Sequence, residues 1–363
     1  MVKKKILIYS TVLLIIGLYM VFQSSQIWAN YLHNDRFFYL KRQALFALIG
    51  LVCFIVAMKI NLHKIRKYSF LILLLGLVIL LLVLFLGVNV NGSTSWFKIG
   101  SFMFQPSEIF KIIIVFYMAD KLDKYYLETN KFYKTILILL IPLVIGFALI
   151  MLQPDLGSAI VILGGIIMMC ILSKNSFYNY LFIGLLGIIC FTILIISSPY
   201  RIERIFAFLN PYNDPLGSGF QLIQSLYAIG PGGIIGKGIN SSFQKHYYLP
   251  EPQTDFIFAI YAEEYGLIGS IILLFLYAML FKNILKLIRE SKNMFNAFLR
   301  IGLASMIIIQ VCINLFVVVG LIPVTGITLP FLSYGGSSLI VVLVSIGLIA
   351  NEKGENDENI IIR

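Results

Sequence analysis

Ten runs of apolar residues limit what this chain can fold into. Most of them are long enough to cross about 30 Å of hydrocarbon as a helix, and helices satisfy all of their own backbone polar groups in lipid. The runs lie at residues 6–22, 44–60, 70–88, 109–118, 136–152, 159–172, 180–197, 256–281, 299–320 and 331–350. The fourth and sixth are the shortest. The sequence therefore predicts an all-α, polytopic integral membrane protein with about ten transmembrane helices.

The composition and the placement of charge agree with this class. Hydrophobic residues make up 60% of the 363 residues and charged residues 12%, whereas soluble domains carry about 25% charged residues. The net charge of +11 would suggest a nucleic-acid surface in a soluble chain, but most of the basic residues fall on one side of the predicted membrane. Lys3, Lys4 and Lys5 assign that side to the cytoplasm. We therefore expect both termini in the cytoplasm and no nucleic-acid partner.

The polar segments on the outer side are concentrated in one large extracellular loop, residues 198–255, between the seventh and eighth predicted helices. Shorter outer loops are expected near residues 30–42, 89–107 and 321–330. The tail at residues 351–363 is polar and is expected in the cytoplasm. No soluble domain is separable, so residues 1–363 are predicted to be a single membrane domain whose functional face points outward.

Several kinds of site are unsupported by the spacing of the polar residues. The four cysteines lie in apolar runs without a CxxC pattern and the three histidines are scattered, which leaves disulfides, structural zinc and a Ser-His-Asp triad without support. The segment GPGGIIGKG, residues 230–238, lacks the first glycine and the final Ser or Thr of a phosphate-binding loop. A flexible loop with a basic side chain is the simpler interpretation, and we expect no nucleotide.

Three acidic residues lie where residues 248–266 enter an apolar run, namely Asp255, Glu263 and Glu264. A carboxylate against hydrocarbon is costly unless it is solvated or paired, which makes these residues candidates for an active site or a transport pathway. The simpler alternative for Asp255 is a helix cap made by its own side chain or by Thr254. Glu263 and Glu264 lie too far along the helix, or on the wrong face, to pair with Asp255, so we interpret them as polar anchors or cavity residues.

Glu108 and Lys111 are three residues apart at the start of the fourth run and share a helix face. Two interpretations are equally supported. The pair either neutralises itself inside the bundle, or Lys111 faces a water-filled cavity and a phosphate while Glu108 orients it.

The basic residues of the outer loops are candidates for binding an anionic substrate. ATP is absent outside the cytoplasm, so a bond-forming reaction there needs a donor that carries its own leaving group, and a lipid-linked diphosphate meets that need. The residues able to receive diphosphate charge are Arg201, Arg204, Lys237, Lys245 and Lys98. Each of them taken singly is more simply a solvated loop charge.

Six ordered blocks of this sequence resemble the SEDS family, the shape, elongation, division and sporulation proteins that include FtsW, RodA and SpoVE. The blocks are FQPSEIFK (104–111), QPDLGSA (153–159), DPLGSGFQLIQSLYAIGPGGIIGKG (214–238), YLPEPQTDFIFA (248–259), EEYGLIG (263–269) and GLIPVTGITLPFLSYGGSS (320–338). The similarity extends from the first apolar run to the last. Three of these segments are closer to FtsW and SpoVE than to RodA, namely GSGFQ, QSL and YLPEPQTDF. This branch favours a role in septal or sporulation wall synthesis over a role in elongation.

The resemblance implies a peptidoglycan glycosyltransferase that polymerises lipid II on the outer face of the bacterial cytoplasmic membrane. The essential acid of the family falls on Asp255, which makes the cap the weaker interpretation. Substrates in this family are lipid II and undecaprenyl-diphosphate-linked glycan. Implied partners are a class B penicillin-binding protein, which is a transpeptidase, and divisome or related wall-synthesis proteins. Ser95 stands where relatives usually have Arg, so any charge needed there must come from elsewhere, for example from Lys98.

The expected chemistry needs one base. A sugar 4-hydroxyl attacks the anomeric carbon of a lipid-diphosphate-linked sugar with inversion, and Asp255 accepts the proton. The diphosphate leaves as an anion that basic side chains or a divalent cation, Mg²⁺ or Mn²⁺, must stabilise. The substrate-binding residues are expected to be Glu108, Lys111, Arg201, Arg204, Lys245, Gln253 and Thr254.

Two rival functions are a lipid II flippase and a non-catalytic scaffold for the transpeptidase. A flippase predicts functional acids in both halves of the membrane, whereas the acids singled out here cluster outward. A scaffold would leave Asp255 dispensable.

Overall fold

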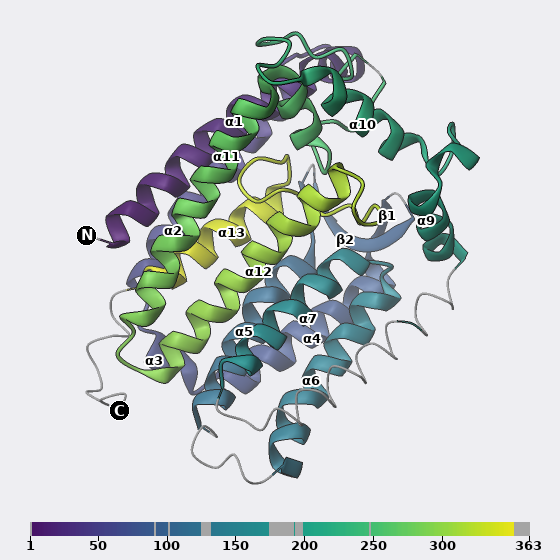
Figure 1. Ribbon diagram of the computed structural model, residues 1–363. Helices are drawn as coiled ribbons and strands as arrows, with labels where there is room; N and C mark the ends of the chain where they lie inside the picture. The colour runs from purple at the N-terminus through teal and green to yellow at the C-terminus, as the bar shows by residue number, and fades with distance from the viewer. Residues whose placement is uncertain are drawn as a thin grey trace.

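The computed structural model is a bundle of helices capped at one end by shorter elements (Figure 1). It describes residues 2–90, 92–100, 102–124, 132–173, 192, 199–246 and 248–351. Within these residues, helices coincide with nine of the ten predicted runs: α1 (Val2–His33), α2 (Phe38–Lys59), α4 (Ser69–Leu86), α5 (Pro106–Lys124), α6 (Phe132–Leu152), α7 (Leu156–Ile171), α11 (Ile257–Arg289), α12 (Met294–Val318) and α13 (Gly336–Ile349). The seventh run lies outside the described residues except at Thr192, and so does the tail after residue 351.

Five of the described helices, α1, α2, α4, α11 and α12, are long and apolar enough to cross a membrane, and α7 and α13 are apolar but shorter. Only 28% of the apolar window is buried in α2, α4 and α11, whereas 67% is buried in α12. The apolar surface that the outer helices leave uncovered suits contact with lipid. The predicted all-α membrane fold is therefore confirmed, with α12 at its centre.

Helix α12 packs against α5, α7, α11 and α13. Its contact with α7 depends on glycine from both sides. A Cβ on Gly302 would lie 2.5 Å from Met169 Sδ, and a Cβ on Gly165 would lie 2.4 Å from Met306 Cγ. Small residues permit this close approach in membrane bundles.

The segments predicted as loops contain short regular elements. Residues 88–104 form an antiparallel sheet of β1 (Val88–Val90), β2 (Ser93–Ile99) and β3 (Phe102–Phe104). The large loop contains α9 (Pro199–Leu209), the 3-10 helix η1 (Pro211–Asn213) and α10 (Phe220–Gly232), while α3 (Leu62–Arg66) lies between α2 and α4. These elements are too short to cross a membrane, which is why a search for long apolar runs did not predict them.

The segment 319–335, between α12 and α13, is not helical and contains Pro323 and Pro330. Proline interrupts a helix because it lacks the N–H donor and its ring clashes with the preceding turn. Helix α13 then begins at Gly336. A Cβ on Gly336 would lie 2.6 Å from the Phe46 ring. This glycine therefore allows α13 to pack closely against α2.

Asp155 fixes the turn between α6 and α7. Its Oδ1 accepts a hydrogen bond from Ser158 N at 3.0 Å and so caps α7. Its Oδ2 accepts from Gln105 Nε2 and Ser107 Oγ, each at 2.8 Å. The carboxylate thereby ties this turn to the start of α5, the helix that carries Glu108 and Lys111.

Candidate active site

Asp255 lies two residues before α11, where the large loop reaches the bundle. The N-cap residue of α11 is Phe256 and makes no side-chain cap hydrogen bond, so the cap interpretation of Asp255 is not supported. Thr254 Oγ1 lies 2.9 Å from Asp255 Oδ1 and 2.8 Å from Glu251 O. The single hydroxyl proton of Thr254 can be donated to only one of these acceptors at a time.

The carboxyl group of Asp255 is poised to exchange a proton near neutral pH. Burial raises its pKa to about 6, an effect that the hydrogen bond from Thr254 opposes. The nearby charge of Glu251 raises the pKa further and that of Arg204 lowers it. An ordinary Asp titrates near 3.9 and is a weaker base than a group with a pKa near the working pH.

Two backbone contacts hold the segment around Asp255. Asn314 Nδ2, on α12, donates to Asp255 O and to Ile327 O, each at 2.7 Å. Tyr334 N donates to Gln253 O at 2.7 Å. The acid is thus fastened both to the central helix and to the segment 319–335.

Glu108 and Lys111 form a buried ion pair, with Lys111 Nζ 2.6 Å from Glu108 Oε1 and side-chain exposures of 7% and 6% respectively. Lys111 Nζ also donates to Gln310 Oε1 at 3.3 Å. Glu108 Oε2 is buried without a hydrogen-bond partner in the described part of the chain. The structure contains the ion pair that the first interpretation requires, and it leaves one carboxylate oxygen able to accept a further hydrogen bond.

Gln310 and Asn314 lie one helical turn apart on α12 and connect this ion pair to the Asp255 segment. Gln310 Nε2 donates to Thr328 O at 3.1 Å, and Thr328 Oγ1 lies 3.0 Å from Ser338 Oγ on α13. We did not predict these two amides as site residues. The available signal was two polar side chains at i, i+4 in an apolar run.

Gln253 and Thr254 immediately precede the acid, as the sequence requires, but their surroundings differ. Gln253 is 4% exposed as a whole residue, and its Oε1 has no hydrogen-bond partner among the described residues. Thr254 is half-buried and contacts Asp255 directly. Thr254 is therefore better placed than Gln253 to influence the acid.

The two arginines of α9 point toward the bundle. Arg201 Nη2 donates to Met151 O at 2.9 Å, and Arg204 Nη1 donates to Val324 O at 2.7 Å. The charge of Arg204 reaches Asp255, where it lowers the pKa. The structure thus brings Arg204 near the candidate acid and places Arg201 at the end of α6.

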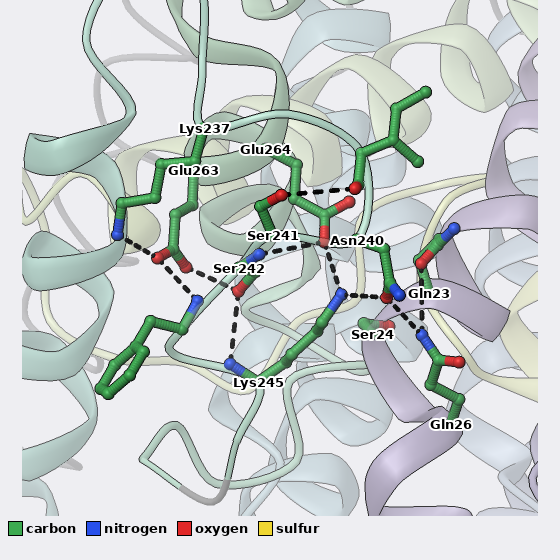
Figure 2. A network of polar contacts seen from close by, with 12 residues as sticks. Gln23, Ser24, Gln26, Lys237, Asn240, Ser241, Ser242, Lys245, Glu263 and Glu264 are labelled. Atoms are coloured by element: carbon green, nitrogen blue, oxygen red, sulfur yellow. Dashed lines mark hydrogen bonds and ion pairs between the residues drawn. The ribbon is translucent and has the colours of Figure 1, made fainter.

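Lys245 does not occupy a position suited to substrate binding (Figure 2). Its side chain is 1% exposed, and Nζ donates to Glu264 Oε1 and to Asn240 Oδ1, each at 2.7 Å. Lys237 Nζ is likewise 2.7 Å from Glu263 Oε1, although its side chain is 32% exposed. Both lysines pair with acids that we interpreted as anchors, and the diphosphate contact of Lys245 stays a prediction that this burial does not favour.

The glycine-rich segment 230–238 is not the free loop that its composition suggested. α10 continues through Pro231 to Gly232, and Gly236 and Gly238 have φ values of 89° and 102°. Such φ values are readily available only to glycine. The segment then lies against α11 through backbone hydrogen bonds.

The start of α2 contributes a cluster near the candidate acid that no motif indicated. The rings of Tyr39 and Tyr334 meet edge to face at 5.0 Å. Gln43 Nε2 donates to Ser333 O at 3.0 Å, and the Arg42 guanidinium lies 4.6 Å from the centre of a neighbouring phenylalanine ring. Because Tyr334 also binds Gln253 O, this cluster adjoins the segment that carries Asp255.

Ser95, the position at which an arginine was expected, is 1% exposed and lies 2.8 Å from Ser93 Oγ. Ser93 in turn donates to Gln153 O. A small hydroxyl fits this buried contact between β2 and the turn after α6. Lys98 is exposed on the same strand, and its substitute role stays a prediction.

The described residues contain no group of three or more His, Cys, Asp or Glu side chains able to hold a metal ion. Asp255 would supply at most part of such a site. Magnesium is often bound by one or two carboxylates together with substrate phosphates. A divalent cation therefore remains a prediction that depends on the substrate.

Comparison with known proteins places this chain in a family. A family model for FtsW, RodA and SpoVE, described as cell cycle proteins, matches residues 4–358. Stage V sporulation protein E of Bacillus subtilis is 45% identical over 348 residues, with 95% of each chain covered. A protein of Geobacter metallireducens named probable peptidoglycan glycosyltransferase FtsW is 39% identical, with 95% of this chain and 93% of that protein covered.

Solved structures share the fold along nearly the whole chain. A chain of a peptidoglycan synthase complex that coordinates polymerization and crosslinking has a TM-score of 0.79 and 28% identity, and the match covers 97% of this chain and 98% of that one. RodA of Thermus thermophilus has a TM-score of 0.70 and 26% identity, covering 95% and 94% of the two chains.

The fold and the site define a polytopic helical membrane protein that holds a titratable acid where its large loop joins the bundle. The chain belongs to the FtsW/RodA/SpoVE family. Its identity to the SpoVE and FtsW relatives exceeds its identity to RodA, in agreement with the predicted branch.

Proposed function

We propose that this chain is a peptidoglycan glycosyltransferase that polymerises lipid II into glycan strands during septal or sporulation wall synthesis. The observation that carries the proposal is Asp255, a half-buried acid with its pKa raised to about 6 at the junction of loop and bundle. Relatives named as peptidoglycan glycosyltransferases and a synthase complex of the same fold support it. RodA-like elongation is the alternative branch.

In the proposed reaction Asp255 acts as general base. The 4-hydroxyl oxygen of one sugar forms a bond to the anomeric carbon of the other, while the bond from that carbon to the diphosphate oxygen breaks with inversion. The hydroxyl proton passes to Asp255, and the lipid diphosphate leaves with the bonding electrons. When Asp255 becomes protonated, Thr254 Oγ1 is released from the carboxylate and can donate to Glu251 O instead.

The basic residues have separate proposed roles. Arg204, whose charge lowers the pKa of Asp255, is the strongest candidate to bind the leaving diphosphate. Arg201, on the same helix α9, is proposed to assist it. Lys111, oriented by Glu108, is proposed to contact a second anionic group of the substrate. Gln253 and Thr254 are proposed to bind the sugar next to the base, and a Mg²⁺ or Mn²⁺ ion would neutralise remaining diphosphate charge.

The proposed setting is the bacterial cytoplasmic membrane, with both termini in the cytoplasm and Asp255 on the outer face. Lys3, Lys4 and Lys5 at the start of α1 support this orientation. We propose that residues 1–363 act as one membrane domain. Its proposed partners are a class B penicillin-binding protein and other wall-synthesis proteins, and a structural relative within a synthase complex supports this assignment.

The test is lipid II polymerisation in detergent by the purified chain in complex with its cognate transpeptidase, with Mg²⁺ or Mn²⁺ present. We expect glycan polymer, and we expect chelation of the cation to reduce it. A flippase moves lipid only across an intact bilayer and would make no polymer in detergent. Transport of lipid II across the membrane of vesicles, without any polymer, would therefore favour a flippase over the transferase. If neither transport nor polymer is detected, the scaffold function is favoured.

The raised pKa of Asp255 predicts a specific pH dependence. Because the base must be ionised, kcat/KM should fall by about tenfold for each pH unit below about 6 and level off above it. Glu251 and Arg204, the charges that act on Asp255, are expected to shift this midpoint but not to reverse its direction. Initial rates between about pH 4.5 and 8, corrected for intact complex, measure it. A profile that stays flat down to about pH 5 would mean that Asp255 is not the titrating base.

A further inference from the structure

Helix α11 is broken at Gly266, where φ is 63° and ψ is −161°. The break separates a short first part, residues 257–265, from a long second part that crosses the bundle. Asp255 lies two residues before the first part, and two adjacent acids, Glu263 and Glu264, lie at its end. As whole residues, Glu263 and Glu264 are 0% and 1% exposed. Whatever fixes this short helix therefore also fixes the position of Asp255.

Residues 236–245, which we call the strap, together with the preceding Gly233 and Ile234, replace the hydrogen bonds that the break removes. In an unbroken helix, Leu267 N and Ile268 N would donate to Glu263 O and Glu264 O. They donate instead to the two carbonyls just before the strap, Gly233 O and Ile234 O, at 2.9 and 3.1 Å. The freed carbonyls of Glu263 and Glu264 accept from two strap amides, each at 3.0 Å.

This contact requires glycine on both sides. A Cβ on Gly236 would lie 2.2 Å from Glu264 O, and a Cβ on Gly266 would lie 2.3 Å from Gly236 N. Both glycines also have positive φ values. The strap and the break therefore form one built junction.

The two buried acids hold the strap through their side chains (Figure 2). Glu263 Oε2 accepts from Ser242 Oγ at 2.6 Å, and Glu263 Oε1 accepts from Phe243 N at 2.9 Å. Glu264 Oε1 accepts from Lys245 Nζ at 2.7 Å. Lys245 and Glu264 are both almost fully buried, with side-chain exposures of 1% and 0%.

The Lys245–Glu264 contact closes a loop that contains Asp255 near its middle. Asp255 lies ten residues after Lys245 and nine before Glu264. The ion pair joins the two ends of this loop, while Asn314 holds Asp255 O from the side of α12. Lys245 also donates to Asn240 Oδ1, which accepts from Gln26 Nε2 on α1 at 2.6 Å. These hydrogen bonds fix the position of the loop relative to both α1 and α12.

A buried ion pair is a poor source of stability, because the cost of removing both charges from water offsets their attraction, and apolar replacements are often as stable. In some proteins such a pair instead selects one defined geometry. We propose that Lys245 and Glu264 are a positioning pair that holds Asp255 in place for proton acceptance. This inference rests on the proposed glycosyltransferase function and assigns the pair no contact with substrate.

The test replaces the pair with neutral residues of similar size, Lys245→Met with Glu264→Gln. The amide that replaces the Glu264 carboxylate could still accept from Ser242 N, and Asn240 keeps its donor on α1. The matched control is Lys286→Met with Glu290→Gln, the same substitutions in an exposed pair at the other end of α11, 3.9 Å apart. Both double variants and Lys245→Arg are assayed for lipid II polymerisation in complex with the transpeptidase.

We expect the buried double variant to keep its Tm within about 3 °C of wild type and its KM for lipid II. Its kcat should fall by about 10- to 100-fold, the scale of a displaced catalytic group. The exposed double variant should match wild type, and Lys245→Arg, which keeps the charge, should recover most of the rate. Wild-type kcat in a folded Lys245→Met/Glu264→Gln protein would overturn the proposal.

A second measurement does not depend on activity. Asp255→Cys is introduced into the wild-type chain and into the double variant, and its rate of modification by a small water-soluble thiol reagent is measured. We expect this rate to change at least about threefold when the pair is removed, because a held side chain and a released one differ in access to reagent. Equal rates would show that the pair does not position residue 255. If the wild-type chain makes no polymer, the proposed function fails, while this reactivity still decides the positioning role.

Discussion

Asp255→Asn will lower the kcat for lipid II polymerisation by about 10² to 10⁴, the usual contribution of a general base. Asn has the shape of Asp and can still accept the hydrogen bond from Thr254, but it cannot take up a proton at neutral pH. Its neighbours should be little disturbed, since Asn314 and Tyr334 contact only the backbone of this segment. Initial rates with saturating lipid II, measured on the purified complex, test this expectation.

The matched control is Asp35→Asn, which makes the same change at a surface acid. Asp35 pairs with Lys41 at 2.7 Å, and their side chains are 33% and 68% exposed, so the pair contributes little. This variant should polymerise lipid II at the wild-type rate. If Asp255→Asn is equally active while its Tm and complex formation are normal, Asp255 is not the base, and the scaffold or flippase gains support.

Asp255 could be predicted as a site residue from sequence because its position next to an apolar run is itself unusual for an acid. An acid directly before an apolar run is costly without a purpose, and a motif of family type surrounds it. Its raised pKa, however, depends on burial by segments far away in the chain. The same is true of the contacts of Asn314 and Tyr334 with residues 253–255, which link positions about 60 to 80 residues apart.

The buried position of Lys245 is a feature that the sequence alone does not predict. A lysine in a polar outer loop is normally solvated, and a diphosphate substrate makes it an attractive ligand. Nothing local indicates that residues 236–245 fold back onto Glu263 and Glu264, because that contact needs the helix to break at Gly266. The anchor interpretation of the two acids was closer to the structure, since two carboxylates in an apolar helix must find partners.

The apolar runs predicted the long helices well, because hydrophobicity over the thickness of a membrane is a strong and local signal. The same signal is silent about β1 to β3, α9 and α10. These elements depend on packing against the end of the bundle, as Ser93 shows by donating to Gln153 O across about 60 residues of sequence. The sequence therefore predicts the long membrane helices more completely than the short elements at the end of the bundle that hold the site.

Of the variants considered, Lys111→Met is expected to lower the stability of the fold most, because it leaves the Glu108 carboxylate buried without its cation. Breaking a buried pair in this way costs about 3–5 kcal/mol, which should lower the Tm by roughly 5 °C or more. Restoring neutrality with Glu108→Gln in the same chain should recover most of that loss, since the amide introduced at position 108 can still accept or donate hydrogen bonds. Thermal unfolding of wild type, the single variant and the double variant in one detergent gives this comparison.

Activity in the same three proteins separates the two roles that sequence left equal. If Lys111 contacts substrate charge, Glu108→Gln with Lys111→Met will fold like wild type and still polymerise lipid II poorly, mainly through a raised KM for the lost anion contact. If the pair only joins α5 to α12 through Gln310, stability and polymerisation will recover together. We expect the first outcome, because Lys111 Nζ donates to Glu108 Oε1 and to Gln310 Oε1 and an ammonium carries three donors, so one can still reach an anionic group of the substrate.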